Sequence, residues 1–403
     1  PLIARVAPGG VLPPGAPVVP VMQPGARPPG TGAVVEVGAG IGAMAAVRAA
    51  ATVGMDVDTE RSQARQAGWT EAEIARAEKR AMELGARYGV APGSALNIVR
   101  EARPTFGGDL DTTLSNISPF FDVLTAMRQK SPGASDAEHN SQLGSMIKAG
   151  EILGYSSDPT KLKEYANFMA QMAQVHGSAL RGEEVLNFAK SGKTAASGVS
   201  FDYLKSIFPT MLPELGGDRL GTASMTLRQA LVGGKMKKLA VENLAALGLI
   251  DESGVVSTTD DDVKGVRANA VKGSKLIETN PLEWVRTVLT PAMDAKGISP
   301  EDRPAKLSGL FSDRNAEYLV NLLVTQGARL DKDRQTVEKA LGLPGAQQAL
   351  ADDPYLAGKR VGGGLANVGS ALSDPFLGPL KAAADAAAGS LNKVAEVARG
   401  DKA

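Results

Sequence analysis

The sequence predicts an all-α protein with many helices, partly elongated, and with at most one short β-hairpin. From Trp69 onward, apolar residues recur at spacings of three and four, as on one face of a helix. Glycine and proline interrupt this pattern at short intervals, which limits most central helices to about 10–18 residues. Only Gly254–Ser257 resembles a strand, and no series of alternating strands follows it. Together these observations favour a purely helical chain.

Composition excludes several classes of function. The 403 residues include 44 basic and 44 acidic residues, whereas a protein that coats nucleic-acid phosphates is strongly basic. We therefore expect no sequence-specific nucleic-acid partner. The chain has no cysteine and two histidines, which excludes thiolate sites and speaks against a histidine metal cage. Aromatic residues make up 4% of the chain, so the composition favours long, lightly packed helices, and we expect no catalytic residue, metal or cofactor.

The first 60 residues differ from the rest. Residues 1–32 hold nine of the 24 prolines, which predicts a Pro/Gly-rich disordered or extended linker. Residues 33–60 predict an Ala/Gly-rich apolar helix. Its apolar run, Ala33–Met55, is about as long as a membrane span. Glu36 and Arg48 interrupt this run, so we expect it to pack against protein, with transient membrane contact left open.

Local signals mark the beginning and end of the next helix. Thr70 and Glu73 form a capping box, and Trp69 and Ile74 occupy the two positions of a hydrophobic staple. A single apolar stripe then follows, before Gly89 and Pro92 end the helix: Ile74, Ala77, Ala81, Leu84 and Tyr88. Ser135 and Glu138 predict a second capping box.

Further helices and turns follow from the same kind of pattern. Leu162, Tyr165, Met169 and Met172 form a stripe that favours core packing over an adaptable binding surface. Later helices are expected over Leu282–Ala295, Asp313–Gln326 and Lys332–Leu341. Turns are expected at Pro209–Pro213, Gly216-Gly217 and Asp251–Asp262.

The end of the chain is rich in alanine. Residues 311–403 predict C-terminal helices, with a break at Gly362–Gly364. Lys381–Arg399 has high helix propensity. Its apolar residues lie on one side, which is typical of a helix that awaits a partner: Leu391, Val394, Ala395 and Ala398.

One glycine-rich string could bind a cofactor. Val34–Gly42 resembles the first motif of class I methyltransferases and partly fits the dinucleotide fingerprint, with Gly38, Gly40 and Ala43. Asp56 and Asp58 stand at a suitable distance for a ribose contact, but no βαβ pattern follows. We therefore expect an Ala/Gly-rich helix, with an S-adenosylmethionine- or nucleotide-binding enzyme using residues 34–43 as the alternative.

Three shorter patterns are interpreted as structural. Ser191-Gly192-Lys193-Thr194 lacks the first glycine of a phosphate loop and predicts a turn that ends a helix. Asp251-Glu252-Ser253-Gly254 resembles the catalytic Glu-Ser of lytic transglycosylases, yet a polar turn is favoured. Asp260–Asp262 lacks the ligand spacing of a calcium loop. His139 and His176 have no acid or nucleophile at a recognisable spacing, so both are expected to be structural or solvent-facing.

The order of these elements resembles the central helical region of bacteriophage tail tape measure proteins. The similarity covers roughly Met55–Arg399 and depends on the order of elements and on the abundance of small residues. It is carried by the following segments: Glu71–Leu84 with Gly85–Ala91, Ser94–Glu101, Ser200–Leu227, Ala245–Gly254 and Ser308–Ala328.

The resemblance implies a structural virion protein and not an enzyme. Residues 61–310 would be the helical tape-measure core. Several copies would lie in the lumen of the tail tube, set its length, and assist genome delivery. The implied partners are the tail tube protein, the baseplate hub, tail assembly chaperones and further copies of the chain. The implied location is the virion tail, with the host cytoplasm during assembly. The start at Pro1 and the short length are typical of a fragment or a small variant.

Overall fold

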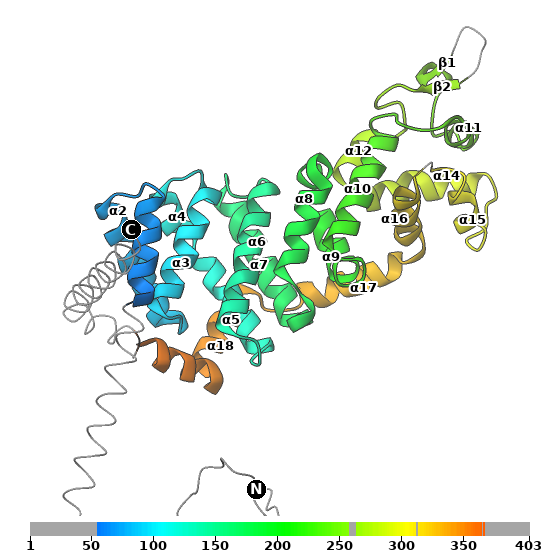
Figure 1. Ribbon diagram of the computed structural model, residues 1–403. Helices are drawn as coiled ribbons and strands as arrows, with labels where there is room; N and C mark the ends of the chain where they lie inside the picture. Colours follow the sequence, from blue (N-terminus) through cyan, green and yellow to red (C-terminus); the bar gives the residue numbers. More distant parts are fainter. Residues whose placement is uncertain (1–54, 258–262, 312, 365, 367–403) are drawn as a thin grey trace, which may run out of the picture. The chain divides into compact units, whose positions relative to one another are not determined.

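A computed structural model describes residues 55–257, 263–311, 313–364 and 366 (Figure 1). These residues are mostly helical, with one two-stranded antiparallel sheet. The predicted all-α fold with one short hairpin is therefore confirmed. All described residues belong to one unit, Ala49–Ala403. The expectations for residues 1–54, Asp260–Asp262 and 367–403 lie outside the described residues.

The first helices follow the local signals closely. A helix over residues 55–66 precedes α2 (Glu71–Tyr88), α3 (Pro92–Ala102), the 3₁₀ helix η1 (Arg103–Phe106) and α4 (Leu110–Asn116). Both hydrogen bonds of the Thr70–Glu73 capping box are present, and Gly89 ends α2 in the left-handed conformation. The predicted stripe from Ile74 to Tyr88 is buried, as expected for an amphipathic helix that packs on a core.

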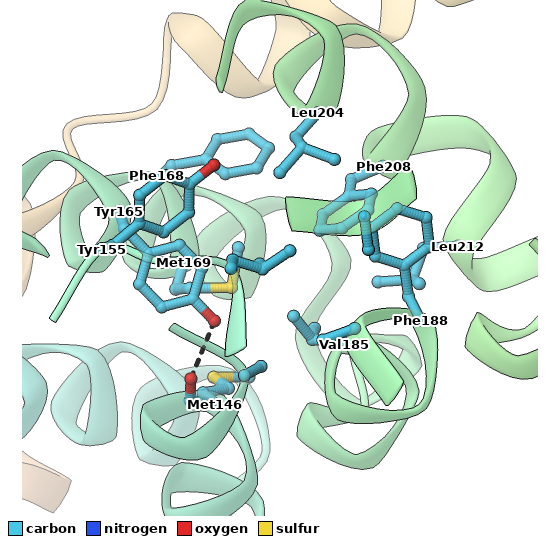
Figure 2. Packing of buried hydrophobic residues seen from close by; sticks show 14 of the residues in the cluster. Met146, Tyr155, Tyr165, Phe168, Met169, Val185, Phe188, Leu204, Phe208 and Leu212 are labelled. Carbon is cyan, nitrogen blue, oxygen red and sulfur yellow. Dashed lines mark hydrogen bonds between the residues drawn. The ribbon is translucent and has the colours of Figure 1, made fainter. Parts of the chain in front are cut away.

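The central helices carry the aromatic core. They are α5 (Ser118–Lys130), α6 (Asp136–Ile152), α7 (Pro159–His176), the 3₁₀ helix η2 (Gly177–Ala179) and α8 (Gly182–Gly198). The stripe of Leu162, Tyr165, Met169 and Met172 is buried, which confirms core packing. The hydroxyl of Tyr165 donates a hydrogen bond to the carbonyl of Met146 across 2.8 Å (Figure 2).

The few aromatic rings are concentrated in one place. Ring contacts of 5.0–6.4 Å form a continuous path through α7, α8, α9 and the joint after α6 (Figure 2). The path runs through Tyr165, Tyr155, Phe201, Phe168, Phe208 and Phe188. The composition favoured lightly packed helices, but these rings join a single cluster of buried residues. Low aromatic content therefore does not make this core sparse.

Helices α9 (Phe201–Leu215) and α10 (Gly217–Leu231) follow. The predicted turn at Pro209–Pro213 is wrong, because both prolines lie inside α9. Neither proline has an N–H to donate, but burial of Leu204, Ile207 and Phe208 on α9 favours the helix. Gly216 does form the expected joint, with φ 75°.

Helices α8 and α10 cross at very short range. A Cβ atom on Gly217 would overlap the carbonyl oxygen of Glu184, and one on Gly221 would lie 2.7 Å from Gly192 N. Only glycine allows two helix backbones to approach this closely. The crossing is fixed further by Gly217 N–H, which donates to the Glu184 carboxylate across 2.6 Å.

The next segment contains the sheet. It comprises α11 (Lys238–Ala246), the 3₁₀ helix η3 (Glu252–Gly254), β1 (Val255–Ser257), β2 (Val263–Val266), α12 (Ser274–Thr279), α13 (Pro281–Trp284), the π-helix η4 (Val285–Leu289), α14 (Thr290–Ala295) and α15 (Arg303–Leu307). Val255 pairs with Val266 and Val256 with Gly265. The predicted Leu282–Ala295 helix is present but contains the π-helix η4 just before Pro291. Because Pro291 has no N–H to donate to the carbonyl four residues earlier, the wider π-helical turn is favoured here.

The last described helices return to the first ones. They are α16 (Arg314–Thr325), α17 (Gly327–Glu338), α18 (Leu343–Asp352) and a helix over residues 354–364. Two boundaries were predicted wrongly. The helix expected over Lys332–Leu341 begins at Gly327 and ends at Glu338, and the expected break at Gly362–Gly364 is helical. Gly363 packs against Gly89, where a Cβ atom would lie 3.0 Å from the Gly89 Cα, so tertiary contact determines this conformation.

We call residues 327–364 the strap. Figure 1 shows α17 against α9, and α18 (orange) against α5. Helices α17 and α18 also contact α7. The strap therefore covers helices that precede it by well over 100 residues in the sequence.

Candidate functional site: polar contacts between the strap and the body

A buried carboxylate joins the beginning of the described chain to its end. Asp122 of α5 is 3% exposed. It accepts hydrogen bonds from the Tyr88 hydroxyl at 3.0 Å and from the Gln347 side-chain amide of the strap at 3.1 Å. Burial raises the pKa of Asp122 and raises that of Tyr88 to about 12. The contact thus links α2, α5 and α18 through a buried hydroxyl and a buried carboxylate, whereas Gln347 on the strap is exposed.

A second link uses a buried cation. Arg128 is 1% exposed, and its guanidinium donates to the backbone carbonyls of Tyr88 and Gly89 at 3.1 and 3.2 Å. It also forms an ion pair with Asp136 at 2.9 Å, and Asp136 accepts from Lys359 of the strap at 3.0 Å. Burial raises the pKa of Asp136, but Arg128 and Lys359 outweigh it and hold that pKa below its ordinary value.

His139 lies one helical turn beyond Asp136 in α6. Its side chain is 3% exposed, and among the described residues neither ring nitrogen has a hydrogen-bond partner. Burial lowers its pKa, and the nearby Arg128 cation lowers it further. His139 is therefore structural and buried in its neutral form.

His176 is the last residue of α7. Burial lowers the pKa of His176, which favours the neutral ring.

Three amides on the outer face of α7 hold the joint between α17 and α18. Asn167 accepts from Leu343 N–H at 3.1 Å, and Gln171 donates to the Ala340 carbonyl at 2.9 Å. Gln174 both accepts from and donates to the Gly342 backbone, at 2.8 and 2.7 Å. These amides satisfy backbone groups that a chain reversal would otherwise leave unpaired.

Helix α9 presents a second polar line to the strap, which we call the α9 seam. It consists of Asp202, Ser206, Thr210 and Glu214, one in every four residues. Arg334 pairs with Asp202 at 2.6 Å and donates to Ser206 at 2.8 Å. Thr210 donates to Asp333 at 2.9 Å, and Arg329 pairs with Glu214. Ser206 and Thr210 are buried by these contacts.

A groove of about 630 Å³ opens between α5, α7, α9 and the beginning of α18. Its lining includes Asp122, Asn167 and Gln171, whose polar atoms already bond to the strap or to α2. Lys205 lies 4.9 Å from the centre of the Phe201 ring. These three polar side chains of the groove are therefore already engaged in contacts that hold the strap or α2.

The short sequence motifs have structural roles here. Ser191–Thr194 lies within α8, so the predicted helix-terminating turn is only partly right: the backbone leaves helical geometry at Lys193 and α8 continues to Gly198. Gly192 lies in the crossing with α10, and Ser191 donates to Asp218. Asp251–Gly254 includes the 3₁₀ turn that precedes β1.

The described residues contain neither a metal-binding cluster nor a membrane-spanning helix. Across residues 55–257, 263–311, 313–364 and 366, no group of three or more His, Asp or Glu side chains is arranged to hold a metal ion. None of the helices in this part of the chain is both long and apolar enough to cross a bilayer.

Sequence reasoning missed the α7 amides and the α9 seam. The seam has a visible signal, since four polar or acidic residues recur at every fourth position on a helix whose other residues, apart from Tyr203 and Lys205, are apolar. Such a line resembles a solvated face, and its partners lie more than 100 residues further along the chain. Comparisons of the chain with protein-family models, curated proteins and solved structures found no match.

Proposed function

We propose that this chain is a structural component of a phage or prophage tail, a tape measure protein that acts as a scaffold inside the tail tube. The proposal includes its setting of tail length and assistance in genome delivery. Its partners would be the tail tube protein, the baseplate hub, assembly chaperones and further copies of itself. Its place would be the lumen of the tail, and the host cytoplasm during assembly.

The observation that carries the structural part of this proposal is the use made of buried polar groups. The buried Asp122 and Arg128, together with the partly exposed Asp136, join segments far apart in the sequence. An active site instead keeps such groups available to a substrate. A scaffold whose helices are held by specific polar joints fits this arrangement.

The ends of the described chain bear on how length would be measured. Gly93 of α3 packs on Asp56, in the first described helix, and Gly89 packs on residues 359–360 in the last. Gly89 and Gly93 are close in sequence, so the two ends meet at one joint. Folded in this way, the region adds little to the distance between its ends, and the proposed ruler requires it to open when it enters a tube.

The test is an in-frame deletion of residues 201–280. If the opened chain measures length as a helix, loss of about 80 residues shortens the tail by on the order of 120 Å. Replacing the same residues with an unrelated helical sequence of equal length should restore the original length. Electron micrographs that show unchanged tail length, or tails that lack this chain by mass spectrometry, would rule out the proposal.

The enzyme alternative depends on residues 34–43. A methyltransferase or dinucleotide-binding domain needs a parallel sheet beside that glycine-rich turn. The strands among the described residues are β1 and β2, which pair antiparallel. No contact in this part of the chain favours the alternative, and a ligand-binding measurement decides it.

A further inference from the structure

We propose that the strap is exchangeable, so that the strap of one copy binds the α5–α7–α9 surface of a second copy. The interaction surface is the α9 seam together with the α7 amides, and the partner is another molecule of this chain. This inference concerns self-association alone and does not depend on the proposed role in a phage tail.

The strap is bound by contacts that specify one partner surface. The seam is acidic at both ends, at Asp202 and Glu214, and the strap presents Arg334 and Arg329 to them. Charge complementarity of this kind fixes register and selects a partner. Every copy carries the same seam and the same strap, so a second copy offers an identical binding surface.

The connection between body and strap favours exchange. Helix α16 ends at Thr325 and α17 begins at Gly327, which leaves Gln326 alone as the linker. A very short hinge loop promotes exchange of the segment that it connects. Gln326 has φ −107° and ψ 15°. Moving these angles to helical values near −63° and −42° would fuse α16 and α17 into one helix that projects the strap away from its own body.

The exchange replaces each internal contact with the same contact between copies. Swapping of identical elements is therefore a low-cost route to a dimer. Several of the contacts that must first open are ion pairs in which one partner is exposed, such as Arg334–Asp202, with side chains 27% and 57% exposed. Such pairs individually contribute little to stability. The same pairs still discriminate strongly against a like-charged surface.

The first test uses two charge-reversed variants. The strap variant carries Arg329→Glu and Arg334→Glu, and the seam variant carries Asp202→Arg and Glu214→Arg. Within one copy, each variant opposes like charges, whereas an exchanged heterodimer restores opposite charges at all four positions. Mixing the two should give heterodimers by native mass spectrometry, at least tenfold more abundant than homodimers of either variant alone.

The matched control carries all four substitutions in one copy. It restores opposite charges within the copy and should show the same monomer–dimer equilibrium as the unmodified chain. A mixture of the two variants that stays monomeric would overturn the proposal.

The second test changes the hinge and keeps the seam intact. In the closed form, residue 327 begins a helix, but in the fused helix it is internal, where glycine is unfavourable. A Cβ atom there would meet Arg286 at 3.8 Å, an ordinary contact. Gly327→Ala should therefore raise the dimer association constant by about fivefold for each of the two exchanged straps. Light scattering over a concentration series measures this constant.

The hinge test also has its own controls. A Gly-Ser-Gly-Ser insertion after Gln326 should remove the dimer, because slack in the hinge allows closure without strain. Gly358→Ala changes a strap glycine that has no neighbour within 4 Å and lies away from the hinge, so dimerisation should not change. If Gly327→Ala and the insertion both leave the equilibrium unchanged, the strap does not exchange.

Discussion

The guanidinium of Arg128 lies 2.9 Å from the carboxylate of Asp136. Asp136 connects this fully buried cation to the strap. The Asp136 side chain is 43% exposed and also accepts from Lys359. A single carboxylate thus neutralises one cation from the body and one from the strap. Because Arg128 also donates to the end of α2, this pair ties together three segments that are distant in the sequence.

Removal of Arg128 should destabilise the fold. Arg128→Met leaves the carbonyls of Tyr88 and Gly89 without their donor and Asp136 without its buried partner. We expect the free energy of unfolding in urea to fall by about 2–3 kcal/mol. Arg80→Met, which breaks an exposed pair with Glu83, should cost less than about 1 kcal/mol. Equal losses for the two variants would contradict a special role for Arg128.

Lys193 adopts a backbone conformation that glycine prefers. Its φ of 47° and ψ of −126° interrupt α8, and such a conformation is costly for a residue with a side chain. Lys193→Gly should raise the free energy of unfolding by about 1 kcal/mol, measured in urea. Lys190→Gly, in the helical part of α8, should instead lower it by a similar amount. A loss of stability in Lys193→Gly would show that the side chain matters more than the strain.

The crossing of α8 and α10 should reject any side chain at Gly217. Because a Cβ atom would overlap the Glu184 carbonyl, Gly217→Ala must separate the helices or bend one of them. We expect a loss of about 1–3 kcal/mol in thermal or urea unfolding. Gly144→Ala, in α6, has only a Glu101 oxygen at 3.7 Å nearby and should be neutral or stabilising.

Stability should fall on mild acidification because of the buried His139 and the partly buried His176. Burial holds the pKa of His139 below its ordinary value of 6.5. In the window between that lowered pKa and 6.5, the unfolded chain binds a proton that the folded chain does not, so stability is lost as the pH falls. His176 acts in the same direction.

His139→Gln should reduce the slope of unfolding free energy against pH between about pH 6.5 and pH 5. Asp122 has the opposite effect nearer its own pKa, which burial raises, so Asp122→Asn should leave the histidine window in place. Urea unfolding curves at several pH values measure both variants. An unchanged slope in His139→Gln would mean that burial does not shift the pKa of His139 between the unfolded and the folded chain.

Calorimetry distinguishes the scaffold from the enzyme alternative. We expect no micromolar binding of S-adenosylmethionine to the purified chain, because its composition and helical pattern are not those of such an enzyme. A clear binding signal that disappears in Gly38→Val or Gly40→Val would instead support the glycine-rich segment as a cofactor site. Gly54→Val, which changes a glycine outside the motif, serves as the matched control and should leave any such signal intact.

The sequence by itself determined the elements whose signals are local. Thr70 and Gly89 bound α2 because capping groups and a left-handed glycine act within one helical turn. The Tyr165–Met169 stripe identified the buried face of α7 because apolar periodicity follows from helix geometry. The same reasoning found α16 between Asp313 and Gln326.

Only the tertiary structure decided the elements that distant contacts control. Pro209 and Pro213 stay within α9 because burial of its apolar face outweighs the missing hydrogen bonds. Gly363 remains helical where it packs on Gly89. The strap lies on the α9 seam, where Arg334 pairs with Asp202 across more than 100 residues of chain. No local pattern encodes such a pairing, since its free energy arises only when the chain has already brought both groups together.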